Sequence, residues 1–119
     1  MSIAELLLET AESDHQLLQT NLDLGDDPEQ PRDLEFILYS NTEDLAALVC
    51  DFITGNGYGR PSFLRMDSDD GVPFWRILVA VHAPATQEIV CTLSGFMACL
   101  SKIYDLEYDG WGCVICKDG

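Results

Sequence analysis

Apolar residues recur with a helical period in three stretches of the chain, the first of which is residues 3–24. The apolar positions of this stretch are Ile3, Leu6, Leu7, Ala11, Leu18 and Leu22. Gly25 follows as a typical helix stop signal. The period weakens around Ser13 and Asp14, which predicts that the first turns fray or form a separate piece.

The clearest helical stripe begins after Ser40-Asn-Thr-Glu43, whose spacing is that of a capping box. Its apolar residues are Leu45, Leu48, Val49, Phe52 and Ile53, and Gly55-Asn56-Gly57 predicts its end. A third helix is predicted from Pro84, a favourable residue for a first helical turn, to Tyr104. Its stripe consists of Ile89, Leu93, Phe96, Met97, Leu100, Ile103 and Tyr104.

Alternation of apolar and polar residues predicts strands at residues 33–39 and 74–82, each with one covered face. Residues 58–66 are predicted to form another strand. This strand should lie at a sheet edge, because Pro61 has no amide hydrogen to donate to a neighbouring strand. The polar turn at residues 67–71 joins it to the following strand as a hairpin.

Near the end of the chain, turn chemistry precedes a short apolar run. Asp109-Gly110 is a turn or bulge signal that can re-aim the indole of Trp111. The apolar run from Cys113 to Cys116 is predicted to be the last strand.

The predicted elements follow the order of a ferredoxin-like fold: a leading helix within residues 1–25, then β-α-β-β-α-β within residues 33–117. The sequence therefore predicts an α+β protein with a split βαβ arrangement, in which a four-stranded antiparallel sheet carries two helices on one face. Right-handed crossovers place the first and third strands at the centre of the sheet. A chain of 119 residues is the size of one domain, so residues 1–119 are expected to form a single unit.

The sheet face turned away from the two helices is called here the open sheet face. It is predicted to carry Glu35, Ile37, Tyr39, Arg76, Leu78, Ala80 and His82. Its apolar members need a cover, which we expect to be the leading helix; the alternative is a partner or dimer surface, with the oligomeric state left open. Tyr39, Arg76 and His82 are also the polar groups on which a small-ligand or enzymatic site would depend.

Charge narrows the range of partners. The chain has 6 Lys and Arg against 21 Asp and Glu, a net charge of -15. Residues 1–71 hold 16 of the acids and 3 of the bases, whereas residues 72–119 hold 5 acids and 3 bases. Direct nucleic-acid binding is disfavoured because affinity for phosphates comes mainly from Lys and Arg. An acidic surface instead favours a basic protein partner, although solubility alone is an alternative explanation.

The sequence also predicts the cellular compartment of the protein and its metal content. Glu5 and Glu9 occupy the region where a signal peptide would be basic, and no segment approaches the roughly 20 apolar residues of a membrane span, so we expect a cytoplasmic protein without membrane association. Five cysteines without a paired framework indicate reduced thiols. Cys113 and Cys116 would face opposite sides of a strand, so we expect no metal and no cofactor.

The whole pattern resembles the family of regulators of ribonuclease E activity B. The residues that carry the resemblance are Glu107-Tyr-Asp-Gly-Trp-Gly112, Gly25-Asp-Asp-Pro28 and the strand end Leu38-Tyr-Ser40, and the similarity covers nearly all of residues 9–116. The resemblance implies a ferredoxin-like protein without catalytic activity. It also implies binding to the non-catalytic scaffold region of that endoribonuclease, which restrains RNA decay.

The resemblance and the charge together give a set of expected contact or supporting residues: Asp26, Asp27, Tyr108, Asp109 and Trp111. Trp111 between two glycines is compatible with a core position as well. Familiar members of the family continue into a long acidic tail, whereas this sequence ends at Gly119, so a relative with another partner is an alternative. Two further alternatives are a small-ligand binder or enzyme using the open sheet face, and an inhibitor or immunity protein for another basic partner.

Overall fold

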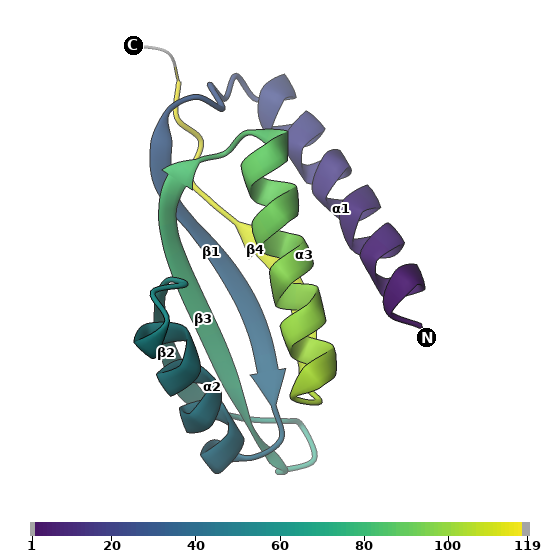
Figure 1. Cartoon of the computed structure of the whole chain (residues 1–119), viewed down its shortest axis with the longest axis vertical. Coiled ribbons are helices and arrows are strands. Elements are labelled where there is room, and N and C mark those ends of the chain that lie inside the picture. Colours follow the sequence, from purple (N-terminus) through teal and green to yellow (C-terminus); the bar gives the residue numbers. More distant parts are fainter. Residues whose placement is uncertain (1, 118–119) are drawn as a thin grey trace.

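A computed structural model describes residues 2–117 of the chain. Its elements are α1 (Ile3–Asp23), β1 (Pro31–Ser40), α2 (Glu43–Gly55), β2 (Arg60–Asp67), β3 (Pro73–Pro84), α3 (Gln87–Ile103) and β4 (Glu107–Gly112) (Figure 1). The strands form one four-stranded antiparallel sheet in the order β2-β3-β1-β4. This is the predicted α+β, ferredoxin-like arrangement, with β1 and β3 central and the proline-containing β2 at an edge.

The core lies between one face of the sheet and the helices α2 and α3. Strict alternation along β1 buries Leu34, Phe36 and Leu38 completely. Opposite them on β3, Val79 and Ile77 are equally buried. Full burial of each such side chain stabilises the fold by roughly 1.5–3 kcal/mol relative to exposure. The alternating pattern in the sequence therefore identified the covered face of the central strands.

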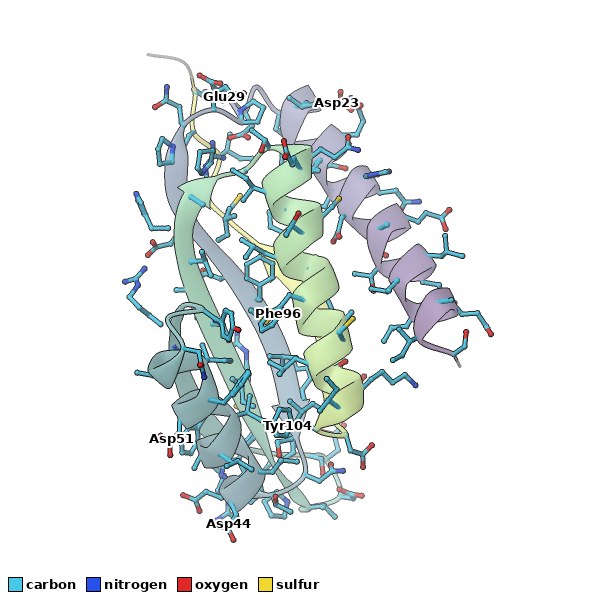
Figure 2. The ribbon with its side chains drawn as sticks, viewed as in Figure 1. Asp23, Glu29, Asp44, Asp51, Phe96 and Tyr104 are labelled. Atoms are coloured by element: carbon cyan, nitrogen blue, oxygen red, sulfur yellow. The ribbon has the colours of Figure 1, made fainter. Side chains whose placement is uncertain are left out.

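Aromatic side chains join α2 to α3 above this core. The rings of Phe52 and Tyr104 have centroids 6.1 Å apart, and those of Tyr58 and Phe96 are 4.7 Å apart. Figure 2 shows Phe96 on the side of α3 that faces α2. One apolar residue of each helical stripe is exposed nevertheless. Leu48 of α2 is 55% exposed, and Ile103 at the end of α3 is 74% exposed.

The helices α2 and α3 both begin later in the chain than their sequence signals predicted. Thr42 rather than Ser40 caps α2, since its hydroxyl accepts a hydrogen bond from the Leu45 amide at 3.2 Å. Ser40 remains in β1 and is buried. Pro84 ends β3 instead of opening α3, whose N-cap is Thr86. The strand ladder extends through both of these positions and delays each helix.

The last strand is also displaced from its predicted place. The Glu107–Gly112 segment itself forms β4, whereas the apolar run from Cys113 to Cys116 has no regular structure. The backbone of this run is bonded to the loop between α1 and β1 instead. For example, Asp27 N donates to Cys116 O at 2.7 Å. Because the loop satisfies these backbone groups, the run does not extend the sheet.

The leading helix does not cover the open sheet face. α1 is one continuous helix that packs against α3 and the edge of β4 (Figure 1). Its weak apolar period is explained by Asp14 and Asn21, two polar residues that are buried on the packed side. Neither fraying of the first turns nor a separate piece is observed. Among residues 2–117, no helix lies over the open sheet face.

Helices that could span a membrane were sought among the described residues, and none is both long and apolar enough.

Candidate functional site

A bulge in β4 brings Tyr108 and Trp111 to the same side of the sheet. Residues three apart on a regular strand face opposite sides. Here the register with β1 shifts, so that Asp109 and Gly110 together lie opposite the single residue Ile37. Gly110 has φ 94°, a conformation that favours glycine. The predicted bulge is therefore confirmed, and it turns the indole of Trp111 inward, where only 8% of the residue is exposed.

The inward side of β4 meets a buried carboxylate from α1. Asp14 Oδ1 accepts a hydrogen bond from Trp111 Nε1 at 3.0 Å and another from Ser94 Oγ of α3 at 3.0 Å. Since the Ser94 hydroxyl hydrogen is directed to Asp14, Tyr108 donates its own hydroxyl hydrogen to Ser94 Oγ across 2.7 Å. We call these four residues the Asp14 network. It joins α1, α3 and β4.

The other carboxylate oxygen of Asp14, Oδ2, accepts no hydrogen bond from the described residues. Asp14 is only 3% exposed. Burial raises the pKa of Asp14 above its ordinary value, against the lowering effect of the hydrogen bonds from Ser94 and Trp111. Burial likewise raises the pKa of Tyr108 well above its usual range. Buried polar atoms are normally paired, so the missing partner of Oδ2 sets this carboxylate apart.

Two adjoining hollows open beside this network, along the outer edge of β4. One has a volume of about 260 Å³ and is lined by Leu6, Glu9, Thr10, Ser13, Asp14, Tyr108, Asp109 and Gly110. The other has about 250 Å³ and is lined by Leu6, Ser101, Lys102, Asp105, Leu106, Glu107 and Tyr108. They share Leu6 and Tyr108, and we call them together the acidic groove. Its lining contains five carboxylates and one lysine.

Asp109 connects the acidic groove to the open sheet face. Its carboxylate accepts a hydrogen bond from the Tyr39 hydroxyl at 3.2 Å. Partial burial, together with the neighbouring charge of Asp109, raises the pKa of Tyr39. Of the residues expected at the contact, Tyr108 and Asp109 therefore line the groove, and Trp111 supports it from the core.

Asp26 and Asp27 belong to a different cluster, beyond the end of β4. Asp26 is 8% exposed, and its Oδ1 lies 2.5 Å from Arg32 Nη1 and accepts a bond from Cys116 N at 2.8 Å. Arg32 also donates to the carbonyl oxygens of Asp27 at 2.6 Å and Val114 at 3.2 Å. This Arg32 cluster fastens the loop after α1 to the segment after β4. The two expected aspartates are thus separated from Tyr108 and Asp109.

The sequence interpretation missed Asp14, Ser94 and Arg32. A signal for Asp14 was present, because the apolar period of α1 fails at that residue. Ser94 occupies a core-facing position between apolar turns of α3. Arg32 is the first basic residue of the chain and follows eight Asp and Glu residues, so an ion pair with one of those carboxylates was to be expected. A polar residue on an otherwise apolar face is therefore the sequence signal for a buried polar contact.

The expected residues of the open sheet face do lie there, but three of them do not converge. In the β1–β3 ladder, Tyr39 pairs with Arg76. His82 lies six residues further along β3, a separation of about 20 Å at 3.3 Å per residue. It contacts Asp33 at 3.1 Å, and Arg60 lies 2.7 Å from the same carboxylate. Hydrogen bonds from Arg60 and His82 lower the pKa of Asp33. This geometry gives no support to a ligand site built from Tyr39, Arg76 and His82.

Within residues 2–117, no group of three or more His, Cys, Asp or Glu residues is placed to hold a metal ion. The five cysteines are free thiols. Cys113 and Cys116 lie in the irregular segment after β4, so the strand geometry expected for them does not apply.

Comparison with known proteins gives one family match. Residues 11–113 match the model of a family described as Regulator of ribonuclease activity B. The matched region includes all four residues of the Asp14 network, the whole sheet and most of α1. No curated protein matches the chain.

Proposed function

Because the chain belongs to the family of regulators of ribonuclease activity B, we propose that it regulates a ribonuclease without catalysis, by binding a basic segment of that enzyme in the acidic groove. The target we propose is the basic, RNA-binding scaffold region of a ribonuclease E-type endoribonuclease. Binding there restrains RNA decay.

The distribution of charge over the fold supports this mode of binding. The first 29 residues, which include α1, hold eight Asp and Glu and no Lys or Arg. Three of the six basic residues, Arg60, Arg65 and Arg76, lie instead on β2 and β3, and β2 is the sheet edge opposite β4. These basic residues offset carboxylates at the other edge of the sheet, whereas the side of α1 and β4 stays acidic. Such a field steers a basic partner to that side and sets its orientation.

The physical basis of regulation is competition for positive charge. A basic scaffold segment binds RNA because its Lys and Arg side chains neutralise phosphates. The same side chains pair with carboxylates when the segment lies in the acidic groove. The regulator and RNA then exclude one another from the segment.

The observation that carries the proposal is the acidic groove itself, with five carboxylates around two adjoining hollows. Its test is calorimetric titration of the protein with the scaffold segment of a ribonuclease E-type enzyme at rising salt. We expect affinity to fall as salt rises. The double variant Glu9→Lys, Glu107→Lys should weaken binding at least tenfold.

The matched control is the double variant Glu29→Lys, Asp51→Lys, which makes the same change in net charge away from the groove. Both of these residues are exposed, and Figure 2 shows Asp51 on α2 and Glu29 in the loop after α1. An equal loss of affinity in both double variants, or binding that does not respond to salt, would contradict the proposal. Binding to basic peptides without binding to the scaffold segment would indicate another basic partner.

A further inference from the structure

Within the acidic groove, we infer an arginine-binding pocket: the hollow of about 260 Å³ beside the Asp14 network receives one arginine side chain of the partner, with Asp14 Oδ2 as its acceptor. This inference rests on the proposed function and adds to it. It assigns one residue type and one acceptor atom to the contact.

The Asp14 network leaves one acceptor unused on a residue that lines the hollow. Trp111 and Ser94 both donate to Oδ1, and Tyr108 reinforces that side of the carboxylate through Ser94. Oδ2 is buried, and none of the described residues donates to it. A carboxylate oxygen in such a place favours a donor that carries positive charge, because a charge-assisted hydrogen bond is about twice as strong as a neutral one.

The lining of the hollow indicates which cation fits. Glu9 and Asp109 add two exposed carboxylates, and the side chains of Thr10 and Ser13 add hydroxyl oxygens. Among the described residues, no three carboxylates converge closely enough to hold a metal ion, so the lining favours a cation with several separate donors. An arginine guanidinium offers five donors spread over a plane, is more weakly hydrated than an ammonium and keeps its charge when partly buried. A lysine offers a compact charge that matches one acceptor and loses more hydration.

Trp111 makes occupation of the pocket observable. Its indole N–H donates to the same carboxylate that would accept from the guanidinium. When Oδ2 gains a cation, the charge on Oδ1 falls and the indole hydrogen bond changes. The ¹H–¹⁵N cross-peak of the Trp111 indole therefore reports binding directly.

The experiment titrates the ¹⁵N-labelled protein with N-acetyl-arginine amide. The neutral, nearly isosteric N-acetyl-citrulline amide is the control ligand, and N-acetyl-lysine amide is a second comparison. The chain has two tryptophans, so Trp75→Phe assigns the remaining indole peak to Trp111. We expect a saturable shift of that peak with the arginine probe, a smaller shift with the lysine probe and none with citrulline.

Three variants separate the pocket from general electrostatics. Asp14→Asn should abolish the shift, whereas Glu12→Gln, which removes an exposed carboxylate from the same helix, should retain it. Thr10→Arg keeps Asp14 and places a guanidinium four residues before it on α1, which is within reach along a helix. That variant should exclude the arginine probe, and it serves if Asp14→Asn does not fold.

Equal shifts with arginine and citrulline, or an unchanged response in Thr10→Arg, would overturn the pocket. The absence of any shift with the arginine probe would do the same. The proposed function has a separate readout, which is the loss of scaffold binding in Glu9→Lys, Glu107→Lys. A protein that passes that test and fails this one binds the ribonuclease through its acidic surface without an arginine pocket.

Discussion

Two buried carboxylates connect the N-terminal part of the chain to its C-terminal part, and their surroundings differ. Asp26 Oδ1 meets the guanidinium of Arg32 and the amide of Cys116. The donors to Asp14 Oδ1 are the uncharged Ser94 hydroxyl and Trp111 indole, and its Oδ2 has no partner among the described residues. Both are nearly inaccessible, with 8% and 3% of the residue exposed, respectively.

The comparison separates a structural role from a binding role. A paired buried ion contributes little net stability, because desolvation of the charges offsets their attraction, but removal of one member leaves a buried charge unpaired. Asp26 is paired through Oδ1 with Arg32 and holds a loop in place. Asp14 has an oxygen without a partner among the described residues, and it lines the hollow for which we propose an arginine. Burial of a carboxylate alone does not distinguish these roles; a hydrogen-bonded cation does.

The largest effect is expected from breaking the Arg32 cluster. Arg32→Met removes the cation from buried Asp26 and also removes the hydrogen bonds that Arg32 donates to the carbonyl oxygens of Asp27 and Val114. The Asp27 carbonyl oxygen keeps its bond from the Gln30 amide. We expect a loss of about 3–5 kcal/mol in the free energy of unfolding, as for other broken buried pairs. Urea denaturation measures it.

Removing both charges sharpens this prediction. The double variant Arg32→Met, Asp26→Leu leaves no unpaired buried charge, so it should be more stable than Arg32→Met alone. A double variant that is as unstable as the single variant would show that the loop is held by the hydrogen bonds from Arg32 to the carbonyl oxygens, rather than by its ion pair with Asp26.

An intermediate effect is expected at Trp111. Trp111→Phe keeps an aromatic ring in the core but removes the N–H that donates to Asp14 Oδ1. Hydrogen bonds to charged groups contribute about 1.5–3 kcal/mol, so a loss of about 2 kcal/mol is expected by the same urea measurement. Trp111→Ala should lose more, because it also empties a buried volume. A loss confined to partner binding, with stability unchanged, would contradict the core position of the indole.

The smallest effect is a change in pH dependence at Asp14. Burial raises the pKa of Asp14 above 3.8, so over a window that starts there the folded protein retains a proton that the unfolded chain has released. The stability contributed by this group therefore falls as pH rises through that window. Asp14→Asn cannot titrate, so relative to wild type it should gain stability as pH rises above 3.8. Urea titrations at several pH values measure the difference.

Glu12→Gln, on the same helix, is the matched control for Asp14→Asn and should follow the wild type. His15 lies next to Asp14 in the chain, and its positive charge lowers the pKa of the carboxyl when protonated. A difference between wild type and Asp14→Asn that stays constant with pH would mean that the carboxylate is ionised throughout the range.

The fold class could be predicted from the sequence because it depends on the spacing of apolar residues along the chain. Alternation along residues 33–39 and 74–82 placed the central strands, and Pro61 assigned an edge. The bulge at Asp109-Gly110 was also predictable, since Gly110 is needed where φ is positive.

What the sequence did not provide was the partner of each buried polar group. The run from Cys113 to Cys116 has the apolar pattern of a strand, but its backbone is bonded to Asp26, Asp27 and Arg32, far away in the chain. The apolar period of α1 fails at Asp14 because a tryptophan 97 residues later requires an acceptor there. Such pairings depend on tertiary contacts that no local pattern contains.

The β4 bulge has a consequence for how this strand tolerates changes in length. Along a strand, the side to which a residue points is a matter of odd or even position, and the additional residue at Asp109-Gly110 reverses that parity once. Deleting Gly110 would leave Tyr108 and Trp111 two residues apart, which is the spacing at which a regular strand points both side chains to the same side. Loss of the bulge without a deletion would instead turn Trp111 toward solvent, because residues three apart on a regular strand face opposite sides. The indole therefore reaches Asp14 either through the bulge or through a strand that is one residue shorter.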